Sequence, residues 1–175
     1  FLMCADKGCI GSFVFLWGWQ SHGDVLNWYA MYDQFEASAL PTVEAMEEMW
    51  TGEAPMNSAP VIASREDGKT GGKIYIDGRT SDQSIALAHG SQHMASVDAT
   101  DPDGDELTYD WKIISDVRQD VGKAMSPIAG LFTGKMGAQV NFKAPSATGY
   151  YRLIVYVRDK AHGTASCAVI PFKVN

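Results

Sequence analysis

The amino-acid sequence predicts a mainly β chain, in which an antiparallel β-sandwich follows a single β/α unit. Beyond residue 60, apolar and polar residues alternate in seven or so short runs separated by turn residues, as in antiparallel sandwiches. Before residue 53, a continuous apolar run precedes a helix with well-marked ends. Residues 54–60, between the two units, are rich in proline and small residues and are typical of a linker.

The first unit, residues 1–53, contains one predicted strand and one predicted helix. Residues 13–17 (Phe-Val-Phe-Leu-Trp) suit a strand buried on both faces of a parallel sheet. Pro41 fits the first helical position, Glu44 favours the positive end of the helix, and Gly52 ends it. The face expected to pack in the core comprises Val43, Met46, Met49 and Trp50. One such unit cannot bury a two-sided strand, so neighbours that this chain does not contain are expected.

The sandwich is expected over residues 61–175. Its predicted strands are residues 61–64, 73–76, 85–87, 93–99, 107–114, 139–143, 150–159 and 164–174. In the strand over 150–159 the residues at 151, 153, 155 and 157 are expected to face the core, because side chains alternate along a strand.

The net charge of -7 is unevenly distributed. Residues 1–53 hold eight acidic residues and one basic residue, so the remaining chain holds 13 of each (21 minus 8, and 14 minus 1). Neither unit has a basic face, which argues against nucleic acid as a partner. No apolar run reaches the roughly 18 residues of a membrane-spanning helix. A chain that begins at Phe1 is expected to be processed, truncated or excised from something longer.

The three cysteines and four histidines suggest no catalytic or zinc motif. Cys4 and Cys9 are close enough in sequence to form a disulfide in an oxidising compartment, and Cys167 is expected to be a buried free thiol. The histidines show no spacing typical of a metal site or a catalytic triad and are expected in loops or at the surface. They are His22, His89, His93 and His162. No serine or cysteine nucleophile motif is present.

An acidic loop predicts a structural Ca²⁺ site. Four aspartates occur within eight residues, around a turn favoured by Pro102 and Gly104, and closely spaced carboxylates are the usual calcium ligands. A further aspartate follows the strand over 150–159, at the same end of an immunoglobulin-like sandwich. The predicted ligands are Asp98, Asp101, Asp103, Asp105 and Asp159. The alternatives are a solvated acidic turn, and a cluster neutralised by Lys160. The spacing departs from an EF-hand.

Two segments of the sandwich resemble a PKD-type, immunoglobulin-like module. Residues 99–111 (Ala-Thr-Asp-Pro-Asp-Gly-Asp-Glu-Leu-Thr-Tyr-Asp-Trp) are followed by residues 149–159 (Gly-Tyr-Tyr-Arg-Leu-Ile-Val-Tyr-Val-Arg-Asp). Such modules pair a tryptophan on the third strand with a Gly-x-Tyr strand, and Trp111 and Tyr151 stand in these places. The usual Asp-Phe-Gly-Asp-Gly after the tryptophan is replaced by Lys-Ile-Ile-Ser-Asp, so the sequence resembles a divergent member over about two-thirds of the chain.

Residues 11–18, 28–31 and 41–52 resemble the last β/α repeat of a TIM barrel related to glycoside hydrolase family 2. The resemblance implies a bacterial polysaccharide-degrading enzyme that is secreted, periplasmic or at the cell surface. This chain would be its non-catalytic C-terminal accessory region, with the sandwich as a structural or spacer module. The two catalytic carboxylates of such barrels come from the fourth and seventh strands, which are absent here. The chain alone is therefore not expected to be catalytic.

The same resemblance indicates a substrate-binding surface. If residues 13–17 are the eighth barrel strand, the residues after it lie at the face where TIM-barrel sites form. The predicted sugar-binding residues are Trp17, Trp19, Gln20 and Trp28. In the competing interpretation Trp17 belongs to the barrel core and Trp19 packs on a neighbouring domain. The expected partner is a polysaccharide or the rest of the barrel.

Two other functions remain open. One is a carbohydrate-binding module that uses outward tyrosines, for which the candidates are Tyr75, Tyr109, Tyr150 and Tyr156. The other is a cell-surface adhesion or interaction domain, because the fold alone does not determine function.

Overall fold

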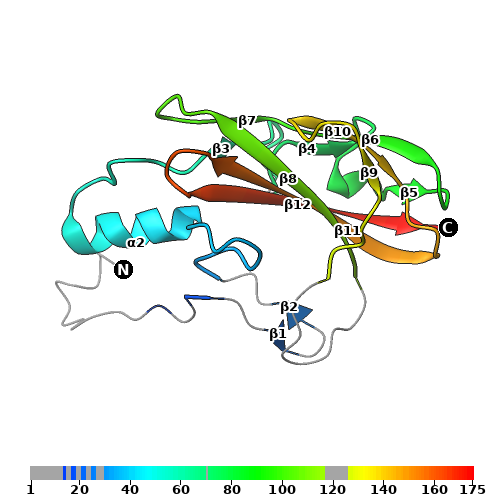
Figure 1. The fold of residues 1–175 in the computed structure, drawn as a ribbon, viewed down its shortest axis with the longest axis horizontal. Helices are drawn as coiled ribbons and strands as arrows, with labels where there is room; N and C mark the ends of the chain where they lie inside the picture. Colours follow the sequence, from blue (N-terminus) through cyan, green and yellow to red (C-terminus); the bar gives the residue numbers. More distant parts are fainter. Residues whose placement is uncertain are drawn as a thin grey trace.

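The computed structural model describes residues 14, 17–18, 21–22, 25–26, 30–69, 71–116 and 126–175. Over these residues the chain is mainly β with antiparallel sheets, which confirms the predicted fold class. Two four-stranded sheets form the body of the molecule, and helix α2 (Pro41–Thr51) lies beside one end of it (Figure 1).

The first sheet has four antiparallel strands in the spatial order β4 (Ile74–Ile76), β6 (Gln92–Val97), β10 (Gln139–Lys143) and β9 (Phe132–Thr133). In β10, Val140 and Phe142 are buried between exposed neighbours, the pattern of a strand with one face on a core. The observed bounds of β10 are those predicted from the alternation. Strand β9 was not predicted, because two residues are too few to show a period.

The second sheet contains the longest strands, in the spatial order β5 (Ala86–Leu87), β12 (Ala165–Val174), β11 (Gly149–Asp159) and β8 (Leu107–Ser115). The pairs of β11 with β12 and with β8 are antiparallel, whereas β5 pairs with β12 in parallel. Shorter elements complete the chain: β1 (Ser21–His22), β2 (Val25–Leu26), β3 (Val61–Ile62), β7 (Ala99–Thr100) and the 3-10 turn η1 (Ser81–Gln83). Strand β3 pairs with β7, and β1 pairs with β2.

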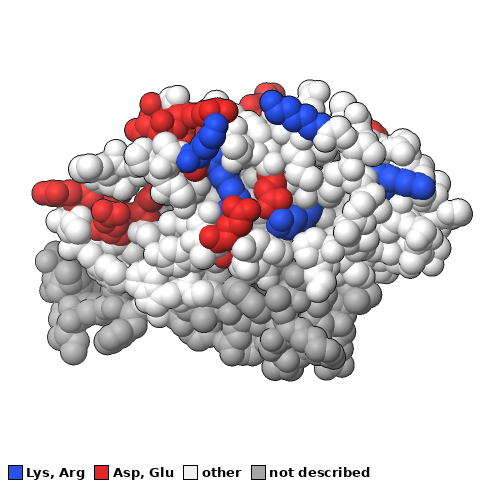
Figure 2. All heavy atoms as spheres, viewed as in Figure 1, with Lys and Arg blue, Asp and Glu red and all other residues white. Residues whose placement is uncertain are grey.

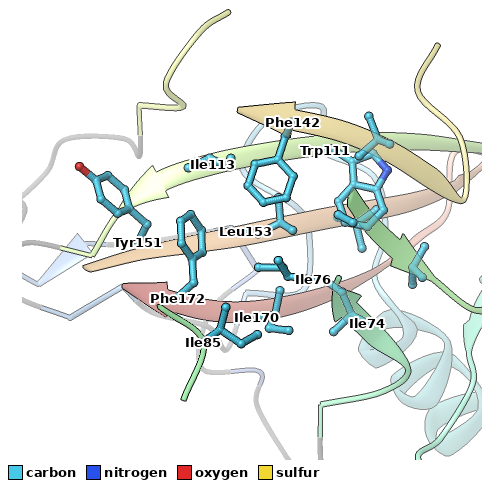
Figure 3. Packing of buried hydrophobic residues seen from close by; sticks show 14 of the residues in the cluster. Ile74, Ile76, Ile85, Trp111, Ile113, Phe142, Tyr151, Leu153, Ile170 and Phe172 are labelled. Carbon is cyan, nitrogen blue, oxygen red and sulfur yellow. The ribbon is translucent and has the colours of Figure 1, made fainter. Parts of the chain in front are cut away.

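The hydrophobic core lies between the two sheets, as Figure 3 shows. Trp111 of β8 is 2% exposed, and its Nε1 donates a hydrogen bond to the carbonyl of Gly137 at 2.8 Å. Tyr151 stacks on Phe172 with ring centroids 5.6 Å apart, and its hydroxyl donates to the carbonyl of Ala147 at 2.9 Å. The two aromatic residues that carried the resemblance thus lie in the core, each with its polar atom satisfied.

Residues 31–40 cover the outer face of the second sheet. Phe35 contacts Tyr156 edge-on, with ring centroids 5.8 Å apart, and packs on a small cluster that includes Ile114 and Ile154. Ala39 pairs with Thr164 at the start of β12. This cover explains why β11 is buried at every position from Leu153 onward, where alternation alone predicted burial of every second residue. The predicted division at residues 54–60 stays a prediction.

Helix α2 begins and ends as predicted, but its packing differs. Pro41 is the first helical residue, and Gly52 ends the helix with a φ of 76° and an N–H that donates to the carbonyl of Glu48 at 2.9 Å. No residue of the helix is fully buried, and Trp50 is 52% exposed. The prediction that this face packs in the core is therefore wrong for Trp50. The other three residues of that face, Val43, Met46 and Met49, are only partly buried. The helix lies beside the sandwich and does not cover a sheet face.

Two further expectations are corrected. Val14 has no regular structure and Trp17 lies in a bend, so neither of these described residues of the predicted strand at 13–17 is in a strand. Cys167 is exposed to solvent rather than buried, although it lines a hollow beside Leu40 where the surrounding atoms raise the pKa of its thiol. Cys4 and Cys9 lie outside the described residues.

Candidate functional sites

The loop after β7 and the turn between β11 and β12 meet at one end of the sandwich. Lys160 connects them, since its N–H donates to the carbonyl of Glu106 at 3.2 Å and its Nζ lies 2.9 Å from Glu106 Oε2. This ammonium group holds the pKa of the Glu106 carboxyl below its ordinary value. Lys160 therefore pairs with a glutamate of the loop, and the alternative in which it neutralises the aspartates is not the arrangement observed.

Three ionisable side chains converge at this end. Among the described residues, ligand atoms of Asp105, Asp159 and His162 all lie within 4.8 Å of one another. His162 Nε2 is 3.7 Å from Asp105 Oδ2. Asp159 is 3% exposed, and its two oxygens accept from Asn57 Nδ2 at 3.0 Å and from the N–H of Ala161 at 2.7 Å. Two carboxylates and an imidazole form a donor set that suits a divalent cation.

The other predicted calcium ligands point elsewhere. Asp101 Oδ1 accepts the N–H groups of Asp103 at 2.9 Å and Asp105 at 3.1 Å, so it shapes its own turn. Asp98 lies at the junction of β6 and β7, with Oδ2 3.8 Å from Lys73 Nζ. Of the five aspartates, the structure brings Asp105 and Asp159 together and adds His162, which the sequence interpretation had assigned to a loop or surface role.

Carboxylates at this end of the sandwich also hold the linker. Asp103 Oδ2 accepts the N–H of Ser58 at 2.7 Å, and Glu44 of α2 accepts the N–H of Ala59. Burial raises the pKa of Glu44, and the nearby charges of Asp103 and Asp101 add to this rise. Figure 2 shows acidic side chains over α2 and over the neighbouring end of the sandwich. Glu44 is half-buried, and its carboxylate holds residue Ala59 against the first turn of the helix.

A buried ion pair attaches residues 31–40 to the second sheet. Arg158 of β11 is 7% exposed, and its Nη1 lies 2.8 Å from Asp33 Oδ2 and 2.6 Å from Ser38 Oγ. Burial tends to raise the pKa of Asp33, but Arg158 and three backbone N–H groups lower it to about 2. Asp33 therefore has a structural role, since its carboxylate attaches residues 31–40 to β11.

An aromatic cluster is exposed beside α2. Trp17 is 46% exposed and lies between Tyr32 and Trp50, with ring centroids 6.3 Å and 6.2 Å away. The N–H groups of Met31 and Tyr32 both donate to the carbonyl of Trp17 at 3.2 Å, which fixes its backbone. Of the predicted sugar-binding residues, Trp17 is in this cluster, while Trp19, Gln20 and Trp28 lie outside the described residues. Trp50 was missed because helical periodicity assigned it to a core face.

The four candidate tyrosines differ in exposure. Tyr150 is 62% exposed and lines a hollow of about 280 Å³ together with Ser81, Asp116 and Lys173. Tyr156 is buried beneath Phe35, whereas Tyr75 and Tyr109 are half-buried. Of these four, Tyr150 offers the most accessible ring.

A chain of three polar side chains was missed by the sequence interpretation. Ser91 Oγ lies 2.6 Å from His93 Nε2, and His93 Nδ1 lies 2.7 Å from Asp77 Oδ2. Asp77 is 16 residues away from His93 in the sequence and belongs to the turn after β4. In the sequence, the only sign of this chain is a serine two residues before a histidine at the start of a strand. That spacing does not identify Asp77 as the third member.

No protein-family model and no curated protein matches this sequence. Among solved structures, a nucleoside hydrolase-related hypothetical protein from Saccharophagus degradans that is associated with carbohydrate metabolism is similar, with a TM-score of 0.40 and 19% sequence identity. The match covers 68% of this chain and 26% of that protein, so the chain spans about a quarter of its length. A similarity of this size does not assign a function to this chain. No helix among the described residues is long and apolar enough to cross a membrane.

Proposed function

We propose that this chain is an accessory region of a polysaccharide-degrading glycoside hydrolase that does not itself cleave glycosidic bonds, exported to the periplasm, the cell surface or the medium. Its role is to contact the polysaccharide and to hold the sandwich in place. The resemblance of residues 11–52 to the end of a glycosidase barrel motivates this proposal. The observation that carries it is the exposed aromatic cluster of Trp17, Tyr32 and Trp50.

Two half-exposed indoles whose centroids are 6.2 Å apart make a surface suited to sugar rings. The flat face of an indole covers the C–H face of a pyranose, and the amphipathic ring keeps its N–H available to a hydroxyl or to water. Solvent-exposed aromatic groups of this size cost free energy in water, so a contiguous set indicates contact with a ligand or partner. The carboxylates of α2 beside them suit a neutral glycan better than an anionic one.

Affinity electrophoresis on β-glucan, xylan and mannan gels tests this proposal. We expect the chain to be retarded on at least one polymer, and Trp17→Ala and Trp50→Ala each to weaken retardation at least about tenfold, the loss of roughly 1.4 kcal/mol. Met56→Ala is the matched control, because Met56 is fully exposed and outside the aromatic cluster. The binding role is contradicted if no polymer retards the chain, or if both tryptophan variants are retarded like the control.

A second candidate, a carbohydrate-binding module on the sandwich itself, is favoured by Tyr150. Its ring is 62% exposed beside a hollow with hydroxyl, carboxylate and ammonium groups, the combination of apolar platform and polar groups that orients a small ligand. Tyr150→Ala on the same gels separates the two surfaces. If this variant alone loses retardation, the glycan binds at the sandwich and the Trp17 surface has another role.

We also propose that a divalent cation, predicted from the acidic loop to be Ca²⁺, binds Asp105 and Asp159 and stabilises the end of the sandwich where their two loops meet. The presence of His162 in the group also suits a borderline metal such as Zn²⁺. A thermal melt with EDTA, Ca²⁺ or Zn²⁺ tests this, since an ion that binds the folded state raises the melting midpoint. Asp105→Asn should abolish the rise and Asp98→Asn should leave it unchanged. Identical melting midpoints in all three solutions would contradict metal binding at this site.

A further inference from the structure

Asp77, His93 and Ser91 form a continuous hydrogen-bonded chain at the end of the first sheet. Asp77 Oδ2 lies 2.7 Å from His93 Nδ1, and His93 Nε2 lies 2.6 Å from Ser91 Oγ. An ionised carboxylate only accepts, so Nδ1 carries a proton, and Nε2 of a neutral imidazole is then an acceptor within reach of the serine hydroxyl. This order of hydroxyl, imidazole and carboxylate is the arrangement that makes a serine nucleophilic.

Both the carboxylate and the imidazole are held in place. Asp77 Oδ1 accepts the N–H of Met94 at 3.0 Å, and the backbone N–H of Asp77 donates to the carbonyl of Met94 at 2.8 Å, so the turn that carries Asp77 is bonded to β6 on both sides. Partial burial raises the pKa of Asp77, but the Met94 N–H and His93 outweigh this and leave the pKa below its ordinary value. The His93 side chain is 13% exposed and packs on Phe142, with ring centroids 5.7 Å apart.

A polar hollow of about 410 Å³ lies beside this chain. It is lined by Asp77, Gln92, His93, Met94, Thr133 and Asn141. Ser91 is bonded to one of these wall residues, His93. Two residues of this lining, Gln92 and Asn141, carry side-chain amides, the type of N–H donor that can stabilise the oxyanion formed during acyl transfer. The shallow, polar shape suits a short acyl group and not a long hydrocarbon chain.

We propose that Ser91 is a nucleophile toward short-chain acyl esters and related electrophiles, with His93 as its base and Asp77 as a positioning residue. Ser91 Oγ bonds to the acyl carbon, its proton passes to His93 Nε2, and the leaving alkoxide takes that proton and departs as an alcohol. Water then attacks the acyl-serine and gives a proton to His93. The carboxylic acid departs as Ser91 regains its proton, so an ester and water give an acid and an alcohol.

Hydrogen bonds at the Ser91 hydroxyl and at the neighbouring backbone N–H groups make Ser91 a slow nucleophile. The Ser91 hydroxyl donates its one proton to the carbonyl of Ala88, which therefore competes with His93 Nε2 for that proton. The N–H groups of Gly90 and Ser91 donate to the carbonyls of Ala144 and Ala88, both at 3.2 Å, so the backbone donors nearest the serine are already engaged. Covalent trapping is therefore a better readout than turnover.

A biotinylated fluorophosphonate tests the proposal on the full chain. Ser91 Oγ displaces fluoride from phosphorus, and peptide mapping by mass spectrometry locates the adduct. We expect the label on Ser91, no label on that peptide in Ser91→Ala, and labelling slowed by about 10²-fold in His93→Gln, the lower end of what a general base supplies. Asp77→Asn should also slow labelling, and Asp77→Glu should restore part of the rate because it keeps the charge.

Two variants serve as matched controls. Ser146→Ala removes an exposed serine and His89→Gln an exposed histidine, and both should label like the wild type. Circular dichroism and thermal melts establish that each variant is folded. The proposal is overturned if the wild type takes no label on Ser91, or if folded His93→Gln labels at the wild-type rate. Glycan retardation should be unaffected in Ser91→Ala, which keeps this test independent of the proposed function.

Discussion

Replacing Asp33 with asparagine tests how residues 31–40 are attached to the sandwich. The Asp33 side chain is fully buried, and its oxygens accept from Arg158 and from the N–H groups of Phe35, Glu36 and Ser38 at 2.8–2.9 Å. Asparagine keeps the size of this side chain but removes its charge and one acceptor oxygen. Arg158 would then be a buried cation without its main counter-ion, although Glu36 and Asp110 remain 3.3 Å and 3.5 Å away.

The magnitude follows from the ionisation of Asp33. Its pKa falls from 3.8 to about 2 in the folded chain, which corresponds to stability on the order of 2 kcal/mol at neutral pH. Removing one partner of a buried ion pair generally costs about 3–5 kcal/mol, and the two remaining carboxylates compensate part of that. We therefore expect Asp33→Asn to lower the free energy of unfolding by about 2–4 kcal/mol.

Urea unfolding at pH 7, followed by tryptophan fluorescence, measures this loss. Because the folded pKa is depressed, the contribution of Asp33 is fully present above about pH 3.8 and is lost as the pH falls toward 2. The acid-induced loss should therefore be smaller in Asp33→Asn than in the wild type. Glu66→Gln is the control, because the Glu66 side chain is 90% exposed in its pair with Lys73 and the loss of its charge should change little. A change within about 0.5 kcal/mol in Asp33→Asn would refute the buried pair.

Two other substitutions test the core and the turns. Trp111→Ala removes a core indole that is 2% exposed together with its bond to Gly137, and urea unfolding should show a loss of about 3–5 kcal/mol; a loss below about 1 kcal/mol would contradict the packing. Gly52→Ala and Gly72→Ala both place a Cβ at positive φ, 76° and 69°, so each should cost about 1 kcal/mol of backbone strain. The second should cost more, because its Cβ would lie 2.8 Å from Cγ2 of Ile62, and equal losses would refute that contact.

Residues 57–60 are bonded to side chains of both the helix and the sandwich. Asn57, Ser58 and Ala59 are each bonded to a carboxylate, from Asp159, Asp103 and Glu44 respectively. The carbonyl of the buried Pro60 accepts from Ser166 of β12. These bonds hold helix α2 beside the sandwich. Because α2 carries Trp50, they would keep the proposed sugar-binding aromatic cluster in a fixed position.

The sequence by itself determined the class of the fold and the position of most strands. Alternation of apolar residues is a local property, and it placed β10 at its observed bounds and predicted burial of Tyr151, Leu153, Val155 and Val157. The helix could be placed because its end signals, Pro41 and Gly52, act on their own backbone. The same periodicity misassigned Trp50, since a helical pattern does not say whether a neighbour covers the apolar face.

Only the tertiary structure decided which polar side chains meet. Asp33 and Arg158 are 125 residues apart in the sequence, and Asp77 reaches His93 across the ladder between β4 and β6. The acidic loop could be recognised from its run of aspartates. In the structure, however, Asp101 and Asp103 accept hydrogen bonds from backbone N–H groups, and His162 of another turn lies beside Asp105. Such partners depend on sheet order and register, which arise from the packing of the whole chain and leave no local pattern in the sequence.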